Sequence, residues 1–101
     1  MADLLLQGKI CLVTGASRGI GAAIARAAAA AGAMVAINYC RSRNLAESLA
    51  EELRNEGGQA MAIQADVGSS ADVERMFATV EKAWGPVSLL VNNAGVSLRE
   101  L

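Results

Sequence analysis

The chain has 101 residues, of which 53% are hydrophobic and 3% aromatic, and its 9 basic and 10 acidic residues give a net charge of −1. This length fits one domain, and the hydrophobic fraction excludes an intrinsically disordered protein. The balanced charge, without runs of one sign, argues against a surface for nucleic acid or for anionic membranes. The apolar stretches are too short for a signal peptide or a bilayer span, so we expect a cytoplasmic protein.

The two cysteines, Cys11 and Cys40, each lie within an apolar run, and the chain contains no histidine. Their spacing does not match that of metal ligands, so we expect no metal site. Buried, reduced thiols are the expected state of both residues. A disulfide between neighbouring strands is the alternative, although it would be unusual in the cytosol.

The first half of the chain contains two strand patterns, residues 10–13 and 34–38, which are rich in apolar and β-branched residues. A glycine-rich turn and a helical pattern that ends at Gly32 lie between them. The apolar positions of this helix are Ile20, Ile24, Ala27 and Ala31. A row of small residues should let the helix pack closely on the sheet; these are Ala23, Ala27 and Ala31.

The second half of the chain repeats this alternation of strand and helix patterns. Leucines at positions 45, 49 and 53 predict a helix that closes at Gly57 and Gly58, and residues 60–64 form the third strand pattern. Ser69 and Asp72 have the spacing of a capping box and predict the start of a third helix. The apolar face of that helix consists of Val73, Met76, Phe77, Val80 and Trp84. Gly85 and Pro86 end the helix before a fourth strand over residues 87–91.

Strands that are apolar on both faces and alternate with helices predict a parallel sheet covered by helices. Right-handed crossovers then give a doubly wound arrangement. In a dinucleotide-binding fold the strand order is 3-2-1-4, with a crevice between strands 1 and 4. We therefore predict an α/β fold, a Rossmann-type doubly wound parallel sheet in the order 3-2-1-4, without a linker or a second domain.

The turn "VTGASRGIG" joins the first strand to the first helix and carries Gly15, Gly19 and Gly21. The N-terminus of a helix exposes unpaired N–H groups and the positive end of a dipole, which attract phosphate. Glycine permits a positive φ and a close approach of ligand to backbone. The turn therefore predicts a phosphate-binding site. The alternative is a turn whose glycines serve packing alone.

The spacing of these glycines is G-x-x-x-G-x-G, which differs from the G-x-G-x-x-G of the general dinucleotide fingerprint. The segment "TGASRGIG" resembles the cofactor loop of the short-chain dehydrogenase/reductase family. The segments "ADV" (residues 65–67) and "NNAG" (residues 92–95), which follow the third and fourth strands, are similar to two further motifs of that family. Within the family, "NYCRS" and "AWGPVSLLVNNAG" look most like β-ketoacyl-carrier-protein reductases and related ketoreductases.

The resemblance implies which residues would bind a dinucleotide. The turn would line the phosphates and the adenosine ribose through Gly15, Ser17, Arg18, Gly19 and Ile20, with Gly21 at the helix–strand contact.

Two later segments would complete this site. Asp66 and Val67 would flank the adenine, with the Asp66 carboxylate accepting from the exocyclic amine; a helix-capping role near Ser69 is the alternative for Asp66. The last motif would pass along the ribose toward the nicotinamide through Asn93, Ala94 and Gly95. Asn92 is expected to tie the fourth strand to the first through backbone bonds.

The end of the second strand, "INYCRSR", bears on the choice of cofactor because it has no acid before Glu47. NAD-specific sites usually place an acid there, which accepts from the ribose 2′-OH and would repel a 2′-phosphate. Arg18 and Arg41 could instead bind that phosphate, with Ser42 donating its hydroxyl. We therefore expect NADP(H). The alternative for Arg41 and its neighbour Arg43 is a solvated pair beside a helix start.

The family resemblance also implies a catalytic Tyr-x-x-x-Lys pair with an upstream serine. The single tyrosine, Tyr39, is followed four residues later by Arg43, so we assign no catalytic residue. Chains of this family are more than twice as long, and we expect this one to be truncated after the fourth strand and inactive alone. The fourth strand would then be an unpaired edge.

Residues 1–101 are thus expected to be the N-terminal dinucleotide-binding part of a short-chain reductase domain. The complete enzyme would reduce a ketone, such as a 3-oxoacyl thioester, to a secondary alcohol by hydride transfer. The carbonyl substrate would bind only if a C-terminal half completed the site, and the resemblance implies a homo-oligomer. A different class of function is a non-enzymatic nucleotide-binding or interaction module that pairs through its exposed sheet edge.

Overall fold

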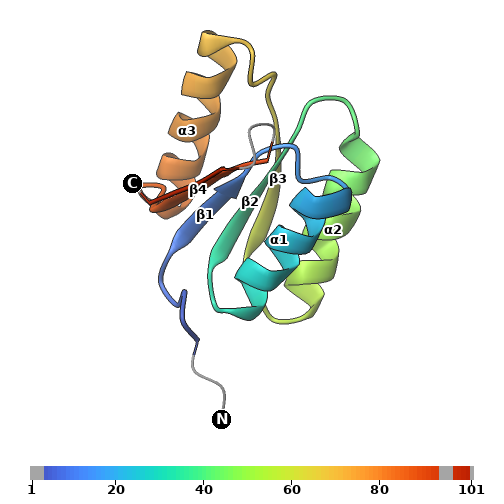
Figure 1. Cartoon of the computed structure of the whole chain (residues 1–101), viewed down its shortest axis with the longest axis vertical. Helices are drawn as coiled ribbons and strands as arrows, with labels where there is room; N and C mark the ends of the chain where they lie inside the picture. Colours follow the sequence, from blue (N-terminus) through green and yellow to red (C-terminus); the bar gives the residue numbers. More distant parts are fainter. Residues whose placement is uncertain (1–3, 94–96, 101) are drawn as a thin grey trace.

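The computed structural model describes residues 4–93 and 97–100, the last four through their backbone alone (Figure 1). Helices and strands alternate along the chain. Their bounds are β1 (Ile10–Val13), α1 (Gly19–Ala30), β2 (Met34–Tyr39), α2 (Arg43–Asn55), β3 (Ala60–Gln64), α3 (Ser70–Trp84), β4 (Leu89–Asn92) and β5 (Ser97–Glu100). The strands form one sheet in the order β3-β2-β1-β4-β5. The predicted Rossmann-type order 3-2-1-4 is therefore confirmed.

The first four strands run parallel, and β1 lies in the centre, with Cys11 opposite Val35 of β2 and Leu89 of β4. Helices α1 and α2 cover one face of the sheet, and α3 covers the other (Figure 1). The apolar core accordingly has two parts, one on each side of the sheet. Among the described residues, no helix is both long and apolar enough to cross a bilayer.

The prediction that β4 forms an unpaired edge is wrong. β5 pairs with β4 in an antiparallel ladder that places Leu90 opposite Arg99 and Asn92 opposite Ser97. Buried backbone N–H and C=O groups need partners, and β5 supplies them for the side of β4 that faces away from β1.

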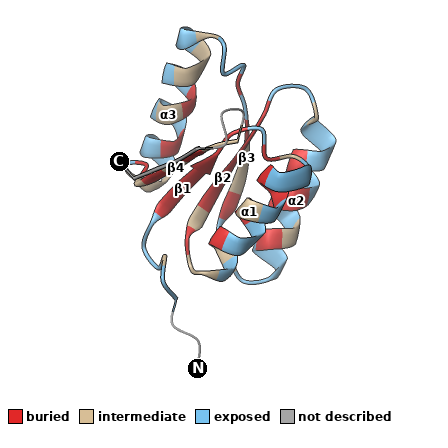
Figure 2. Ribbon diagram, in the orientation of Figure 1, coloured by how far each residue is buried: buried red, intermediate tan, exposed pale blue. Residues whose placement is uncertain are grey.

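The inward face of α1 also differs from the predicted one. Ile20 is 66% exposed, and Ala23 and Ala27 are exposed as well. The buried residues of this helix are Gly21, Ala22, Ala25 and Ala28. Figure 2 shows that buried residues, in red, gather along the strands of the sheet. The close contact of Gly21 with the preceding turn sets the rotation of this helix about its axis.

The predicted faces of the other two helices are confirmed in their main parts. α2 buries Leu49 and Leu53 together with two alanines, although Leu45 is 47% exposed. α3 buries Met76 and Val80, and Phe77 and Trp84 pack against the same part of the core. The predicted cap is present, because the Asp72 N–H donates to Ser69 Oγ at 3.2 Å.

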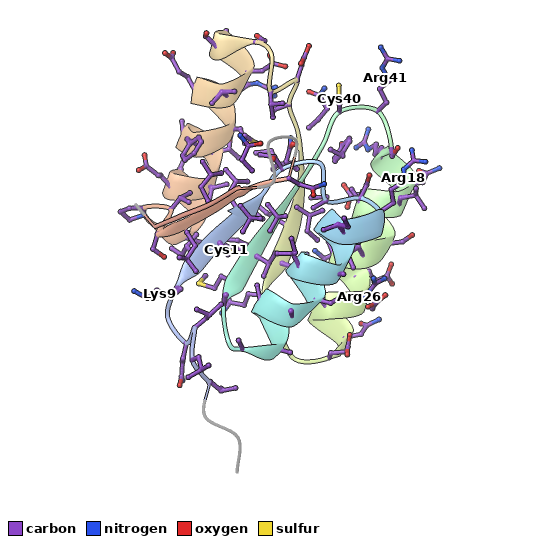
Figure 3. The ribbon with its side chains drawn as sticks, viewed as in Figure 1. Lys9, Cys11, Arg18, Arg26, Cys40 and Arg41 are labelled. Carbon is purple, nitrogen blue, oxygen red and sulfur yellow. The ribbon has the colours of Figure 1, made fainter. Side chains whose placement is uncertain are left out.

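The two cysteines have different environments, and both are free thiols (Figure 3). Cys11 lies buried in β1, as predicted. Cys40 was predicted to be buried, but it is exposed, because β2 ends at Tyr39 and the next residue begins the surface loop. No group of metal-binding side chains occurs in the described part of the chain.

We expect the two thiols to differ in alkylation. Burial raises the pKa of the Cys11 thiol to about 11, so at pH 8 it is protonated as well as inaccessible. Iodoacetamide should add once to the native protein and twice in urea, as read by mass spectrometry. The Cys40→Ser variant should gain no adduct while native. Rapid labelling of Cys11 in the folded protein would contradict this arrangement.

The centre of the sheet should be sensitive to a loss of side-chain volume. Leu12 is 0% exposed, so Leu12→Ala should lower the free energy of unfolding by about 2–5 kcal/mol in urea titrations. The matched variant Leu45→Ala, at a half-exposed position, should change it by no more than about 0.5–1 kcal/mol. Equal losses in the two variants would contradict the assignment of Leu12 to the core.

Candidate functional site

The carboxyl ends of the parallel strands meet at one edge of the sheet, where open α/β folds bind ligands. Four segments lie there: the turn after β1, the loop after β2, the loop after β3 and the end of β4. The residues predicted from the motifs lie on these segments. Ala94 and Gly95 fall outside the described residues, so their predicted role is not addressed by the structure.

The glycine turn has a shape that larger residues would not allow. Gly15 and Gly19 have φ of +59° and +62°, in the region that favours glycine. A Cβ at Gly21 would lie 2.6 Å from the Gly15 carbonyl oxygen, so helix and turn touch there without a side chain between them. A Cβ at Gly19 would meet nothing within 4 Å, which leaves open space above the start of α1.

The start of α1 fits an anionic group. Arg18 occupies the N-cap position without capping the helix through its side chain, and the first turn contains no acidic residue. The first backbone N–H groups of a helix have no partner within the helix, and they attract phosphate when no side chain caps them. The turn, the open space at Gly19 and the helix start therefore fit the pyrophosphate of a dinucleotide.

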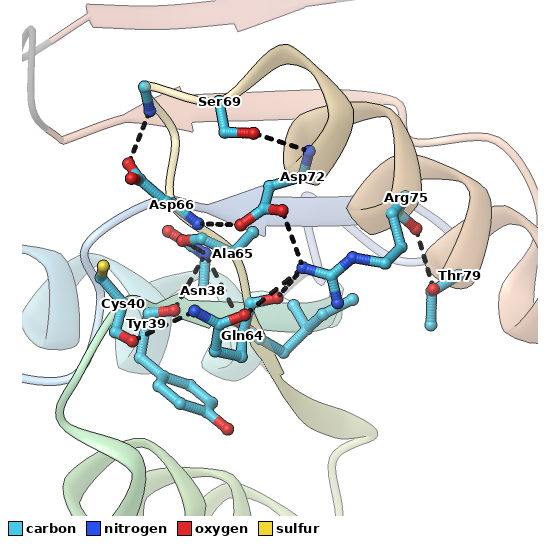
Figure 4. A network of polar contacts seen from close by, with 12 residues as sticks. Asn38, Tyr39, Cys40, Gln64, Ala65, Asp66, Ser69, Asp72, Arg75 and Thr79 are labelled. Atoms are coloured by element: carbon cyan, nitrogen blue, oxygen red, sulfur yellow. Dashed lines mark hydrogen bonds and ion pairs between the residues drawn. The ribbon is translucent and has the colours of Figure 1, made fainter.

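Asn38 is a buried polar residue in the middle of this edge, and it was not predicted as a site residue. Its side chain is 2% exposed within β2. The Gly15 N–H donates to Asn38 Oδ1 at 3.1 Å, and Asn38 Nδ2 donates to the Ala65 carbonyl oxygen at 3.1 Å. Figure 4 shows the amide between the ends of β2 and β3. One side chain thus links the glycine turn to the loop that carries Asp66.

The end of β4 is tied to the same turn. The Asn93 N–H donates to Thr14 Oγ1 at 3.0 Å, and Asn93 Nδ2 donates to the Gly15 carbonyl oxygen at 3.1 Å. The Thr14 N–H donates to the Val91 carbonyl oxygen at 3.0 Å. Asn92 adds a side-chain contact, with its Oδ1 3.3 Å from Thr14 Oγ1. The end of β4 is therefore tied to β1, with Asn92 contributing a side-chain contact where backbone bonds were expected, and Asn93 shares in the tie. A cofactor contact of Asn93 stays a prediction.

Two of the three residues predicted to bind a 2′-phosphate are in contact. Arg18 Nη2 donates to Ser42 Oγ at 2.8 Å, which joins the glycine turn to the start of α2. Arg41 is exposed one residue before Ser42 and extends from the loop into solvent (Figure 3). Residues 38–46 contain no acid. This corner of the site is therefore basic.

The loop after β3 presents an acid beside an apolar residue. Asp66 Oδ1 accepts the Gly68 N–H at 2.9 Å, and the Asp66 N–H donates to Asp72 Oδ2 at 2.9 Å (Figure 4). The side chain of Ser69 caps α3, and Asp66 accepts the N–H groups of Gly68 and Ser69 just before it, so the alternative of a capping role near Ser69 stays open. Val67 is 44% exposed, and so it offers an apolar side chain to a ligand beside the Asp66 carboxylate.

The described residues do not bring the tyrosine near a lysine. Tyr39 is buried at the carboxyl end of β2. Lys9 precedes β1, and Lys82 lies in the last turn of α3, so both occupy the opposite end of the sheet. The described residues therefore offer binding groups for a dinucleotide but no pairing of tyrosine with lysine for acid–base chemistry.

The contact at Gly21 predicts an unusual response to substitution. Glycine to alanine inside a helix normally stabilises a protein by about 1 kcal/mol. Gly21→Ala should instead lower the free energy of unfolding by about 1–3 kcal/mol, because the new methyl group meets backbone atoms. The exposed control Ala23→Gly should also lose about 1 kcal/mol, from helix propensity. Higher stability of Gly21→Ala in urea titrations would contradict the close contact.

Comparison with known proteins identifies the wider group. Residues 9–101 match the family model described as short chain dehydrogenase. The chain is 47% identical over 89 residues to the short-chain dehydrogenase/reductase homolog YusS of Bacillus subtilis, covering 88% of this chain and 82% of that protein. It is 46% identical over 91 residues to the 3-oxoacyl-acyl-carrier-protein reductase FabG of Staphylococcus epidermidis, covering 90% of this chain and 37% of that one.

A solved structure agrees with this result. The short chain dehydrogenase from Burkholderia cenocepacia J2315, in complex with NADP, superposes with a TM-score of 0.83 at 46% identity, covering 87% of this chain and 36% of that one. The chain spans about a third of the length of several curated relatives that it matches. Because the family model matches residues 9–101 and the chain covers 82% of YusS at 47% identity, the chain belongs to the short-chain dehydrogenase/reductase family.

Proposed function

We propose that residues 1–101 are the NADP(H)-binding part of a short-chain oxidoreductase domain. The observation that carries this proposal is the 2.8 Å hydrogen bond between Arg18 and Ser42, in a corner without acids. The other N–H groups of the Arg18 guanidinium can donate to a 2′-phosphate by charge-assisted bonds. The Burkholderia structure in complex with NADP supports the same choice of cofactor.

The described residues have distinct roles in this proposal. Backbone groups of Gly15, Ser17 and Gly19 would hold the phosphates at the start of α1, while Gly21 keeps the helix close to the turn. The basic corner of Arg18, Arg41 and Ser42 would take the 2′-phosphate. The apolar surfaces of Ile20 and Val67 would support the adenosine, and the Asp66 carboxylate would accept from its amine. When bound, the nicotinamide supplies the hydride; Asn93, Ala94 and Gly95 would lead toward it.

The reaction of the complete protein is also a proposal. Similarity to FabG supports reduction of a ketone, such as a 3-oxoacyl thioester, to a secondary alcohol. The carbonyl substrate would meet residues beyond this chain, in a homo-oligomer of the cytoplasm, where free thiols such as Cys11 and Cys40 are usual. The alternative is a non-enzymatic nucleotide-binding or interaction module that pairs through an exposed sheet edge; that edge would not be β4, because β5 pairs with it.

Removal of the Arg18 guanidinium should weaken the binding of NADPH much more than the binding of NADH. Charge-assisted hydrogen bonds contribute about 1.5–3 kcal/mol, so Arg18→Ala should weaken NADPH binding about 10- to 100-fold. NADH binding should change by less than about twofold, because NADH has no 2′-phosphate to lose contact with. Isothermal titration calorimetry at low salt would measure both, since screening weakens this contact at high salt.

Arg26→Ala is the matched control. Arg26 is an exposed arginine of the same helix, and its Nε donates to Glu52 Oε2 at 2.7 Å, away from the glycine turn. This variant should bind both cofactors as the wild-type chain does. Equal losses of NADPH and NADH in Arg18→Ala, or tighter binding of NADH by the wild-type chain, would overturn the proposal.

A further inference from the structure

We infer that Asn38 is a positioning residue for the dinucleotide site: its buried amide holds the glycine turn and the Asp66 loop at a fixed separation. The inference rests on the proposed function for what the two loops bind. Asn38 lies next to neither loop in the sequence, yet it contacts Gly15 at 3.1 Å and Ala65 at 3.1 Å. These are the residues that begin the phosphate turn and directly precede Asp66.

The two partners determine the chemistry required at this position. The Gly15 N–H needs an acceptor, and the Ala65 carbonyl needs a donor, so only one orientation of the amide satisfies both. An apolar residue would leave both backbone groups unpaired in a buried place. An ionised carboxylate would satisfy Gly15 but would face the oxygen of Ala65 with a lone pair. Among the polar residues of this length, asparagine therefore fits both contacts.

The backbone of Gly15 is held from two sides. Asn38 of β2 accepts from its N–H, and Asn93 at the end of β4 donates to its carbonyl oxygen at 3.1 Å. The backbone of β2 contributes as well, because the Ala16 N–H donates to the Asn38 carbonyl oxygen at 3.0 Å. Gly15 has φ of +59°, so these bonds fix a turn that glycine alone would leave free to move. The separation of the phosphate and adenine loops is therefore set by Asn38.

Asn38→Asp tests this role through its pH dependence. A protonated carboxyl can accept from Gly15 and donate to Ala65, as the amide does. Burial and the facing carbonyl raise the pKa of such a carboxyl, so it is neutral at low pH and becomes charged as the pH rises. Tyr39 adjoins Asn38 in the sequence, and Asp66 adjoins its partner Ala65; the hydrogen bonds of the Asn38 side chain go to backbone groups alone.

The readout is the dissociation constant for NADP⁺, measured by calorimetry and divided at each pH by the wild-type value, which cancels titration of the ligand itself. This ratio should stay within about threefold at pH 5 and rise to about 30-fold or more at pH 8, as the contact with Ala65 is lost. Asn55→Asp makes the same change at an exposed position of α2, and its ratio should stay near one throughout. A ratio for Asn38→Asp that does not change with pH would overturn the inference.

A measurement without ligand separates this inference from the proposed function. In Asn38→Ala the Gly15 amide should exchange with solvent about tenfold faster relative to the Leu12 amide of the central strand, which reports global opening. If exchange at the two amides accelerated equally, Asn38 would contribute only to the global stability of the fold, and the inference would be overturned. If the wild-type chain binds no NADP⁺, the proposed function fails, and the Gly15 exchange alone decides whether Asn38 positions the turn.

Discussion

The architecture of the site depends on one constraint: where parallel strands end together, the backbone groups just beyond them have lost their ladder partners and still require hydrogen bonds. Side chains from neighbouring strands supply those bonds in this protein. Asn38 serves the turn after β1 and the loop after β3, and Asn93 serves the same turn from β4. Thr14 joins β1 to β4. Because of these bonds, loops far apart in the sequence hold one arrangement.

The charged groups proposed to bind the cofactor lie outside this network of hydrogen bonds. These hydrogen bonds are made by neutral amides and a hydroxyl, which carry no charge that would have to be desolvated. The charged groups, Arg18 and Arg41, stand at the exposed corner, where a charged ligand can reach them. This division would leave the charged side chains free to adapt to the proposed 2′-phosphate while the neutral side chains hold the loops. It also explains why a glycine at position 21 matters: the helix proposed to bind the phosphate touches the glycine turn directly at that point.

Much of this could be predicted from the sequence, and the errors have physical causes. The strand order followed from the rules for doubly wound, dinucleotide-binding folds, and the cap at Ser69 followed from the spacing of a capping box. The core faces of α2 and α3 followed from periodicity, since large and small side chains contrast in these two helices. The alanine-rich α1 lacks this contrast between large and small side chains, and the rotation of the helix about its axis depends on the contact at Gly21. Its inward face was therefore predicted wrongly. β5 was missed because a short polar segment becomes a strand only through the free edge beside it.

The same reasoning explains what was missed within the site. The glycines and Arg18 stand in a motif, whereas Asn38 lies inside the apolar run "VAINY" and looked like a strand residue. A polar side chain in a strand buried on both faces is itself a signal, because burial demands a partner for it. Its partners, however, are distant in sequence and are visible only in the folded chain. Cys40 was misplaced because it directly follows an apolar run, yet it lies one residue beyond the end of β2 at Tyr39 and is therefore exposed.

The most direct measurement is an NMR titration of the chain with two adenosine fragments, 2′,5′-ADP and 5′-AMP. If the carboxyl edge of the sheet binds a 2′-phosphorylated adenosine, both fragments should shift the amides near Gly15 and Asp66, and only 2′,5′-ADP should shift those of Arg18 and Ser42. Identical shifts from the two fragments, or shifts confined to a surface away from the glycine turn, would contradict binding of a 2′-phosphorylated adenosine at this edge.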